Sequence, residues 1–194
     1  MREDLQGARR ARALVSLLVE KGVLTEDELR RSMATMAEWT PAIGARAVAK
    51  AWVDPGFRTR FLADAKEAFA DLGITEDLPE RLVALENTPE VHNVVVCTLC
   101  SCYPSAILGP APGWYKSLNY RARVVREPRV VLEEFGVRLD AGVEVRVYDS
   151  TADVRYLVVP TRPPRTEDLG EEELSTLVTR DSMIGVGLAQ GPEG

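Results

Sequence analysis

The sequence predicts an α+β fold, in which a helical N-terminal arm over residues 1–75 precedes a layered α-β-β-α domain over residues 76–194. Two observations lead to this prediction. The first 72 residues repeat apolar side chains at three- and four-residue steps, the spacing of one helix face. From about residue 78 onward, compact β-branched runs and alternating segments appear, which are typical of strands.

Several helix boundaries can be placed within the N-terminal arm. Gly22 follows the first apolar repeat and is expected to end that helix. Thr25 and Glu28 have the spacing of a capping box, in which each side chain bonds the other residue's amide. Thr40 and Asp54 each precede a proline, the usual arrangement at a helix start.

The apolar face of the arm is uneven. From Pro55 a dense stripe of phenylalanine, leucine and alanine runs to Gly73, whereas the stripe over residues 5–19 is thinner and carries more charge. A thin apolar face predicts either a solvated helical hairpin or an arm laid over a partner.

The second half alternates between the two kinds of element. Residues 91–96 form a β-branched run, typical of a buried strand. Proline and glycine predict a loop at 103–113. Helices are expected at 114–125, 128–135 and 171–178, and two alternating segments, 143–148 and 154–159, are expected to pair with each other as strands.

Composition excludes several classes of function. The 194 residues include 24 basic and 30 acidic side chains, for a net charge of −6, which disfavours nucleic-acid binding. The single histidine, His92, excludes metal sites that need two or three imidazoles. No apolar run approaches a membrane span and the start has no hydrophobic signal core, so no membrane contact and a cytoplasmic location are expected.

All three cysteines lie within six residues, at Cys97, Cys100 and Cys102. In a reducing compartment such a cluster indicates metal binding or redox chemistry more than a structural disulfide. Zinc or an iron–sulfur cluster would need a fourth ligand, which a partner could supply. These alternatives and a redox role stay open on spacing alone.

A third kind of metal site follows from the one-residue gap between two of the thiolates. If a metal takes the sulfurs of Cys100 and Cys102, the amide nitrogens of Ser101 and Cys102 lie between them and can act as deprotonated ligands. Such ligands need a strongly Lewis-acidic ion, typically Co(III) or Fe(III). Cys97 can then bind on one axial side, and the opposite side stays open for water or substrate, as in a catalytic site.

The segment around these cysteines, residues 96–103, resembles the metal-binding signature of nitrile hydratase α subunits. The similarity extends over residues 86–96, 114–117, 120–129 and 177–186, and thus over most of the chain after residue 86. The resemblance implies hydration of a nitrile to its amide, with Cys97 as the axial thiolate, Cys100 oxidised to a sulfinate and Cys102 to a sulfenate. The nucleophile is either the Cys102 oxygen or a water.

The resemblance also implies a cofactor and partners. Thr98 is the residue usual in cobalt-type members, so Co(III) is favoured over Fe(III). A β subunit, either one chain or split into two, is expected to complete the site, and the N-terminal arm is expected to wrap it. A metallochaperone or activator is a further expected partner.

One departure from the family pattern concerns the substrate. Ser105 stands where many nitrile hydratases have tryptophan, three residues after the last cysteine. Its small side chain predicts a bulky nitrile, such as a nucleoside of the toyocamycin type, unless a partner side chain fills the space. The alternative functions are a thiocyanate hydrolase subunit, for which a basic residue would be expected near Ser105, and a non-catalytic zinc or metal-delivery module.

Other residues receive structural interpretations. His92 is expected to be a hydrogen-bonded strand residue, and Glu90 an exposed turn carboxylate. Core packing is expected of the two aromatic residues at 114–115. Ion pairs within the chain or across a subunit contact are expected for Arg121, Arg123 and Arg126.

Overall fold

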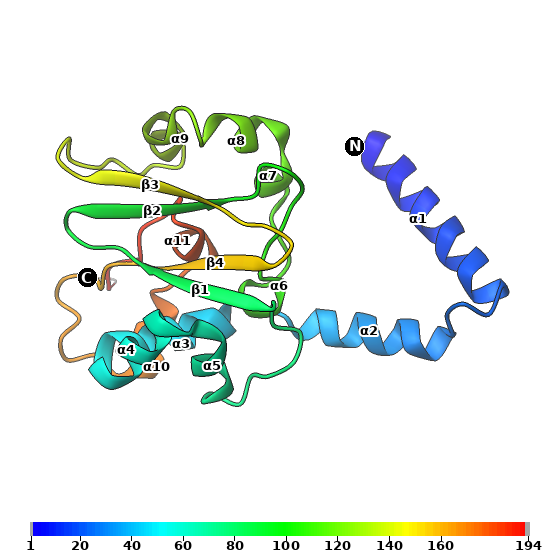
Figure 1. The fold of residues 1–194 in the computed structure, drawn as a ribbon, viewed down its shortest axis with the longest axis horizontal. Helices are drawn as coiled ribbons and strands as arrows, with labels where there is room; N and C mark the ends of the chain where they lie inside the picture. Colours follow the sequence, from blue (N-terminus) through cyan, green and yellow to red (C-terminus); the bar gives the residue numbers. More distant parts are fainter. Residues whose placement is uncertain (1, 193–194) are drawn as a thin grey trace. The chain divides into compact units, whose positions relative to one another are not determined.

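A computed structural model describes residues 2–192 of the chain (Figure 1). These residues divide into two compact units, one ending at Glu38 and the other beginning at Trp39. Each unit is described by itself. Helices and small parallel sheets are both present, in agreement with the predicted α+β class.

The first unit consists of helices α1 (Arg2–Glu20) and α2 (Glu26–Glu38). Gly22 adopts a positive φ of 67° after α1, and the capping box predicted at the start of α2 is confirmed. The Glu28 amide donates to the Thr25 hydroxyl at 3.1 Å, and the Thr25 amide donates to the Glu28 carboxylate at 2.8 Å. No side chain of α2 is buried, and none of α1 from Arg9 to Glu20 is, so these parts of the unit contribute little core of their own.

The second unit begins with α3 (Pro41–Val53), α4 (Pro55–Ala63) and α5 (Ala65–Ala70). Asp54 caps α4 as predicted, accepting from the Phe57 amide at 2.8 Å, whereas the Thr40 side chain makes no capping hydrogen bond. The dense stripe after Pro55 is not one helix. It breaks at Asp64, whose carboxylate caps α5 by accepting from the Glu67 amide at 3.1 Å.

Four strands form two parallel pairs, seen at the centre of Figure 1: β1 (Arg81–Glu86) with β4 (Val154–Val159), and β2 (Val91–Val96) with β3 (Glu144–Asp149). The prediction that 143–148 and 154–159 pair with each other is therefore wrong. Each instead pairs with one of the two earlier strands. In this register Val96 lies opposite Asp149, so β2 and β3 end at the same edge.

Four short helices lie between the second and third strands: α6 (Ser105–Leu108), α7 (Gly113–Lys116), α8 (Leu118–Arg123) and α9 (Pro128–Glu134). The loop predicted at 103–113 thus contains a helical turn. The helix predicted at 114–125 is interrupted at Ser117, which has extended backbone and caps α8 by accepting from the Tyr120 amide at 3.1 Å.

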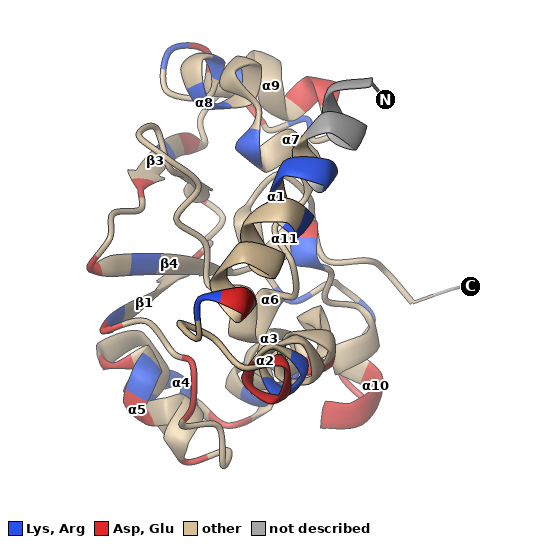
Figure 2. Cartoon of the chain, turned by 90° about the vertical axis from the view of Figure 1, so that its right-hand side faces the viewer, with Lys and Arg blue, Asp and Glu red and all other residues tan. Residues whose placement is uncertain are grey.

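The chain closes with α10 (Glu171–Thr176) and α11 (Arg180–Ile184). Three glutamates occupy the first turn of α10, where the helix dipole favours negative charge (Figure 2). The core combines aromatic side chains of α4 and α5 with aliphatic side chains of the strands and α11. No helix in the described part of the chain is long and apolar enough to span a membrane.

Gly185, at the end of α11, packs closely against the backbone of β2, and its substitution tests this packing. It has a φ of +89°, and a Cβ at this position would overlap the carbonyl oxygen of Asn93 on β2. We predict that Gly185→Ala lowers the free energy of unfolding by about 3 kcal/mol or more, from backbone strain and the overlap together. Denaturant titration of the full chain measures this loss.

Gly142→Ala is the matched control, because a Cβ there meets no atom within 4 Å. Its unfolding free energy should stay within about 0.5 kcal/mol of the unmodified chain. Equal stability of the two variants would contradict the close approach of α11 to β2.

Candidate metal centre

The three cysteines lie in the segment that directly follows β2, residues 97–102, referred to below as the cysteine loop. The strand before it is buried, with Val94 and Val96 fully inaccessible. Cys97 is also fully buried, whereas Cys100 is exposed and Cys102 half-buried. The end of a buried strand thus presents one sulfur from inside the protein and two from its surface.

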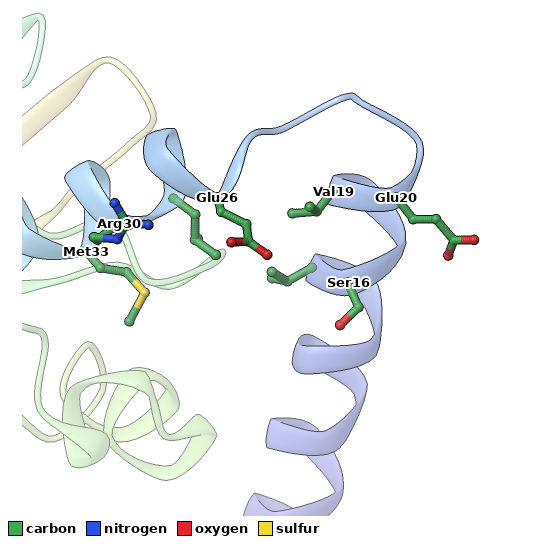
Figure 3. A pocket seen from close by; sticks show the side chains of 8 residues that line it. Ser16, Val19, Glu20, Glu26, Arg30 and Met33 are labelled. Atoms are coloured by element: carbon green, nitrogen blue, oxygen red, sulfur yellow. The ribbon is translucent and has the colours of Figure 1, made fainter.

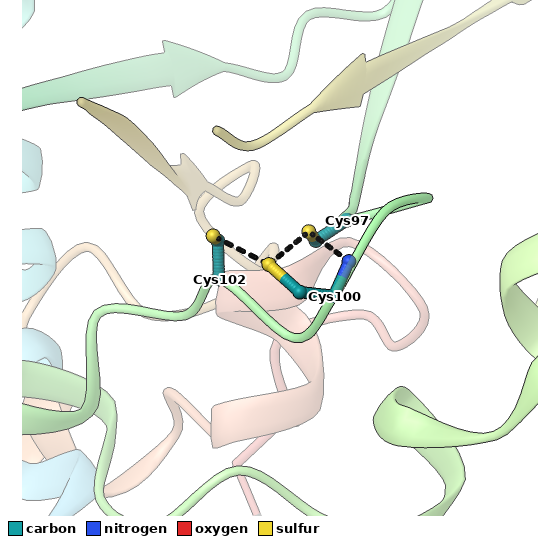
Figure 4. Close-up of side chains that lie close together, drawn as sticks. All are labelled: Cys97, Cys100 and Cys102. Atoms are coloured by element: carbon teal, nitrogen blue, oxygen red, sulfur yellow. Dashed lines mark hydrogen bonds between the residues drawn. The ribbon is translucent and has the colours of Figure 1, made fainter. Parts of the chain in front are cut away.

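The loop turns back on itself so that the three sulfur atoms converge (Figure 4). The Cys97 and Cys100 sulfurs are 3.4 Å apart, and those of Cys100 and Cys102 are 3.0 Å apart. All three lie within 4.8 Å of one another, and none forms a disulfide. The Cys100 amide also donates to the Cys97 sulfur at 3.3 Å, which tightens the turn.

The sulfur atoms share protons unequally. Donation from Cys102 and Cys97 lowers the pKa of the Cys100 thiol to about 7. Burial, together with the hydrogen bond to Cys100, raises the pKa of Cys102 to about 12. Three thiolates at these separations would repel one another, so full deprotonation requires a nearby cation. The soft donor set and its spacing therefore fit a metal ion that prefers sulfur ligands.

Three residues outside the loop hold its backbone. Tyr115 of α7 donates its hydroxyl to the Cys102 carbonyl at 3.0 Å. Arg121 of α8 donates to the carbonyls of Cys97 at 2.9 Å and Thr98 at 2.6 Å. Asp149, the last residue of β3, accepts from the Thr98 amide at 2.9 Å and also from the Thr98 hydroxyl.

The sequence did not reveal these three roles. An ion pair was expected for Arg121, but within this chain its partners are carbonyl groups. Arg126 likewise donates to a carbonyl group, that of Ala122. Arg123 does form the expected pairs, with Glu127 and Glu134. The role of Asp149 could have been suspected from its position directly after the alternating segment 143–148, because an acidic residue at a strand end can reach a neighbouring loop.

An aromatic cluster lies beneath the cysteine loop. Tyr103 and Tyr115 meet edge to face at 5.1 Å, and Trp114 meets Tyr120 at 4.9 Å. The predicted core packing at 114–115 is confirmed for Tyr115, which is fully buried. Burial raises the pKa values of both Tyr115 and Tyr120, so their hydroxyls stay protonated as donors. Tyr120 uses its hydroxyl to bond the Val95 carbonyl at 2.8 Å.

His92 is a buried, hydrogen-bonded strand residue, as predicted. Its Nε2 lies 2.7 Å from the Gly185 carbonyl oxygen, and its Nδ1 lies 3.2 Å from the Asn87 side-chain amide. Because a carbonyl only accepts, Nε2 carries the proton and Nδ1 accepts from Asn87. Both ring nitrogens are therefore occupied, and the imidazole has no free position for a metal.

The remaining candidates lie at the surface. Ser105 begins α6 and is half-buried, while the next three residues of that helix are buried. Ser101 lies in the cysteine loop with an exposed side chain. Glu90 is an exposed turn carboxylate that accepts from the Thr88 hydroxyl at 2.9 Å, as expected.

An α+β domain with three sulfur atoms converging at a strand end offers a set of donors that could hold a metal ion. The family model for the nitrile hydratase alpha chain matches residues 6–187. The chain therefore belongs to the nitrile hydratase α-chain family, and the identification made from residues 96–103 is confirmed.

Similar proteins agree on the family. The chain is 49% identical over 192 residues to the low-molecular-weight cobalt-containing nitrile hydratase subunit alpha of Rhodococcus rhodochrous, covering 98% of this chain and 93% of that protein. It is 52% identical over 180 residues to the cobalt-containing subunit alpha of Pseudonocardia thermophila, covering 91% and 88%.

The chain is also similar to a solved iron-type nitrile hydratase and to a thiocyanate hydrolase subunit. A double mutant of the Fe-type nitrile hydratase from Comamonas testosteroni Ni1 matches with a TM-score of 0.90 at 43% identity, covering 97% of this chain and 92% of that one. The thiocyanate hydrolase subunit gamma of Thiobacillus thioparus is 42% identical over 185 residues, covering 90% and 76%.

The buried imidazole predicts a pH effect on stability. Burial lowers the pKa of folded His92 below its ordinary value of about 6.5. As the pH falls through that value, the unfolded chain takes up a proton that the folded chain refuses. We predict that the unfolding free energy falls from pH 7 toward pH 5 by up to about 1.4 kcal/mol per pH unit from this residue.

His92→Gln isolates the effect, because the chain has no other histidine. Denaturant titrations at several pH values should show a shallower acid limb for this variant than for the unmodified chain. Parallel pH profiles of the two proteins would refute a neutral, buried imidazole.

Proposed function

We propose that this chain is the metal-binding catalytic α subunit of a cobalt nitrile hydratase, which converts a nitrile and water to the amide. One observation supports the proposal above all others: the sulfurs of Cys97, Cys100 and Cys102 lie within 4.8 Å of one another on a chain of the nitrile hydratase α family.

The proposed ligands are the three cysteine sulfurs and the backbone nitrogens of Ser101 and Cys102. Cobalt as Co(III) is favoured over Fe(III), with support from Thr98 and from the two cobalt-containing relatives. Cys100 is proposed to be a sulfinate and Cys102 a sulfenate, which are successive steps of cysteine oxidation.

A trivalent metal ion bound here would supply Lewis-acid polarisation of the carbon–nitrogen triple bond. The residues of the chain would do the rest. Cys102 is the proposed catalytic residue, because its sulfenate oxygen can add to the nitrile carbon as a carbon–nitrogen π bond breaks. A water would then displace the amide oxygen from the sulfur, supply the two amide protons and restore the sulfenate; direct attack by a water is the alternative. The hydroxyl of Tyr115 fixes the Cys102 carbonyl, which keeps this residue in one orientation.

A β subunit, one chain or two, is the proposed partner. The first unit supports this idea with an open groove of about 620 Å³ between α1 and α2 (Figure 3). Its lining combines apolar side chains such as Val19 and Met33 with the charged Glu20, Glu26 and Arg30. Helices that bury so little of their own apolar surface gain stability from a partner that covers it.

The division into a helical part over residues 1–75 and a layered α-β-β-α metal-binding domain over residues 76–194 stays a proposal. The part proposed to wrap the partner is α1 and α2, because α3, α4 and α5 already pack into the core of the second unit. A metallochaperone or activator is proposed to load the metal. The cytoplasm is the proposed location.

Ser105 is the proposed substrate-binding residue. A serine in place of an indole leaves on the order of 100 Å³ of side-chain volume empty, a large part of a pocket of roughly 300–1,000 Å³. A bulky nitrile such as toyocamycin is therefore the proposed substrate, and the half-exposed position of Ser105, three residues after Cys102, supports it.

Thiocyanate hydrolysis is the second candidate function, and the 42% identical gamma subunit favours it. The absence of charge on Ser105 argues against it, since an anion would gain from a basic side chain there. Thiocyanate turnover by the assembled complex that exceeded its nitrile turnover would establish this alternative. A zinc or metal-delivery module without catalysis would show turnover of neither substrate.

The ligand set predicts the composition of the active complex. We expect about one cobalt per chain, and an intact mass raised by three oxygen atoms, about 48 Da, on Cys100 and Cys102. Cys102→Ser should retain less than about 1% of nitrile hydration, because a ligand and the proposed nucleophile are lost together. Metal analysis, mass spectrometry and amide formation measure the three quantities.

Ser101→Ala is the control, because only the backbone nitrogen of this residue is a proposed ligand. It should retain cobalt and the added oxygen atoms. Zinc without added oxygen in an active, unmodified complex would overturn the proposed function.

The size of residue 105 predicts substrate preference. Ser105→Trp should lower kcat/KM for toyocamycin by about 10-fold or more, whereas acrylonitrile should change by less than about 3-fold. Ser105→Ala, which keeps the space open, should preserve the preference for the bulky nitrile. A strong preference of the unmodified complex for acrylonitrile would contradict this assignment.

A further inference from the structure

The cysteine loop is held by hydrogen bonds more than by packing. Leu99 at its centre is 84% exposed, and Cys100 and Ser101 are exposed as well. Cys97 at its start is fully buried, and Thr98 and Cys102 are half-buried. The path of the backbone between these ends must therefore be set by polar partners.

Arg121, on helix α8, donates two hydrogen bonds to the backbone of the loop. Its Nε donates to the Cys97 carbonyl at 2.9 Å, and its Nη2 donates to the Thr98 carbonyl at 2.6 Å. No carboxylate in the described part of the chain forms an ion pair with this guanidinium. The rigid planar fork of arginine suits two successive carbonyls, which a single ammonium group would match less well.

Asp149 acts on the same peptide group from the other side. Its carboxylate accepts from the Thr98 amide at 2.9 Å, and the same carboxylate accepts from the Thr98 hydroxyl. The peptide between Cys97 and Thr98 thus has a cation at its oxygen and an anion at its nitrogen. Hydrogen bonds to charged groups are stronger than neutral ones, so this peptide plane is firmly oriented.

The orientation of this peptide fixes the direction in which Cys97 presents its sulfur. A rotation of the plane would move the Cys97 Cβ relative to Cys100, whose amide donates to the Cys97 sulfur at only 3.3 Å. We propose that Arg121 is a positioning residue of the metal centre, which acts with Asp149 through the Cys97–Thr98 peptide to aim the Cys97 sulfur at the other two. The proposal rests on the proposed function.

Two substitutions of Arg121 test this role. Arg121→Gln removes the charge and the fork, and Arg121→Lys keeps the charge but bonds fewer carbonyls. In the complex with its partner, Arg121→Gln should lower cobalt per chain or kcat by about 10-fold to 100-fold, the usual range for residues that orient metal ligands. KM should change by less than about 3-fold, and Arg121→Lys should recover part of the loss.

Spectroscopy supplies a readout independent of turnover. The sulfur-to-cobalt charge-transfer absorption of Arg121→Gln should shift or broaden, because the Cys97 sulfur is less well fixed. Arg126→Gln is the matched control, since Arg126 also donates to a carbonyl, that of Ala122 at 3.0 Å, away from the cysteines. It should keep cobalt content, absorption and kcat within about 2-fold of the unmodified complex.

The outcomes are separable. Arg121→Gln and Arg121→Lys that match Arg126→Gln in cobalt content, absorption and kcat would overturn the positioning role. Loss of cobalt together with loss of circular dichroism and thermal stability in both Arg121 variants would also overturn it, as a general folding effect. An unmodified complex without cobalt would instead overturn the proposed function, on which the positioning role rests.

Discussion

The structure depends on one constraint: three sulfur atoms from a six-residue surface segment must converge although little packing holds that segment in place. The sulfur separations of 3.0 and 3.4 Å bring groups together that would repel one another as thiolates. The fold meets this constraint at the backbone. The cation of Arg121 and the anion of Asp149 fix the peptide group at the start of the loop, and the phenol of Tyr115 fixes the Cys102 carbonyl at its end.

Two of those anchors, Tyr115 and Arg121, come from the consecutive helices α7 and α8, and the third, Asp149, comes from the more distant β3. The rest of the fold brings them together at the loop. The parallel pairing of β2 with β3 places Asp149 opposite Val96, one residue before the cysteine loop begins. The aromatic cluster around Tyr115 and Tyr120 ties α7 and α8 to the same strand end. Buried His92 and Gly185 secure α11 against β2 at a distance from the sulfurs.

The sequence was informative where the signal is local. The cysteine spacing, the buried run before it and the capping box at Thr25 each depend on residues a few positions apart, and the structure has all of them. Two breaks, at Asp64 and Ser117, also had local signals, because both residue types cap helices and interrupt an otherwise helical pattern.

Long-range features could not be read in the same way. Strand β1 was missed because Arg81–Glu86 has charged ends and only a short apolar centre, and its partner β4 lies about seventy residues away. The residues of a strand do not specify which distant strand it pairs with. The role of Arg121 was hidden for a related reason: its acceptors are carbonyl groups, which every residue carries.

Three sulfurs and two backbone nitrogens of this one loop are proposed to hold the metal, with no imidazole. X-ray absorption spectroscopy at the cobalt edge of the active complex tests it most directly. We expect a ligand shell of three sulfur atoms from Cys97, Cys100 and Cys102, with nitrogen ligands that persist in the His92→Gln variant. A shell of four sulfurs, or one that loses a nitrogen in that variant, would contradict it.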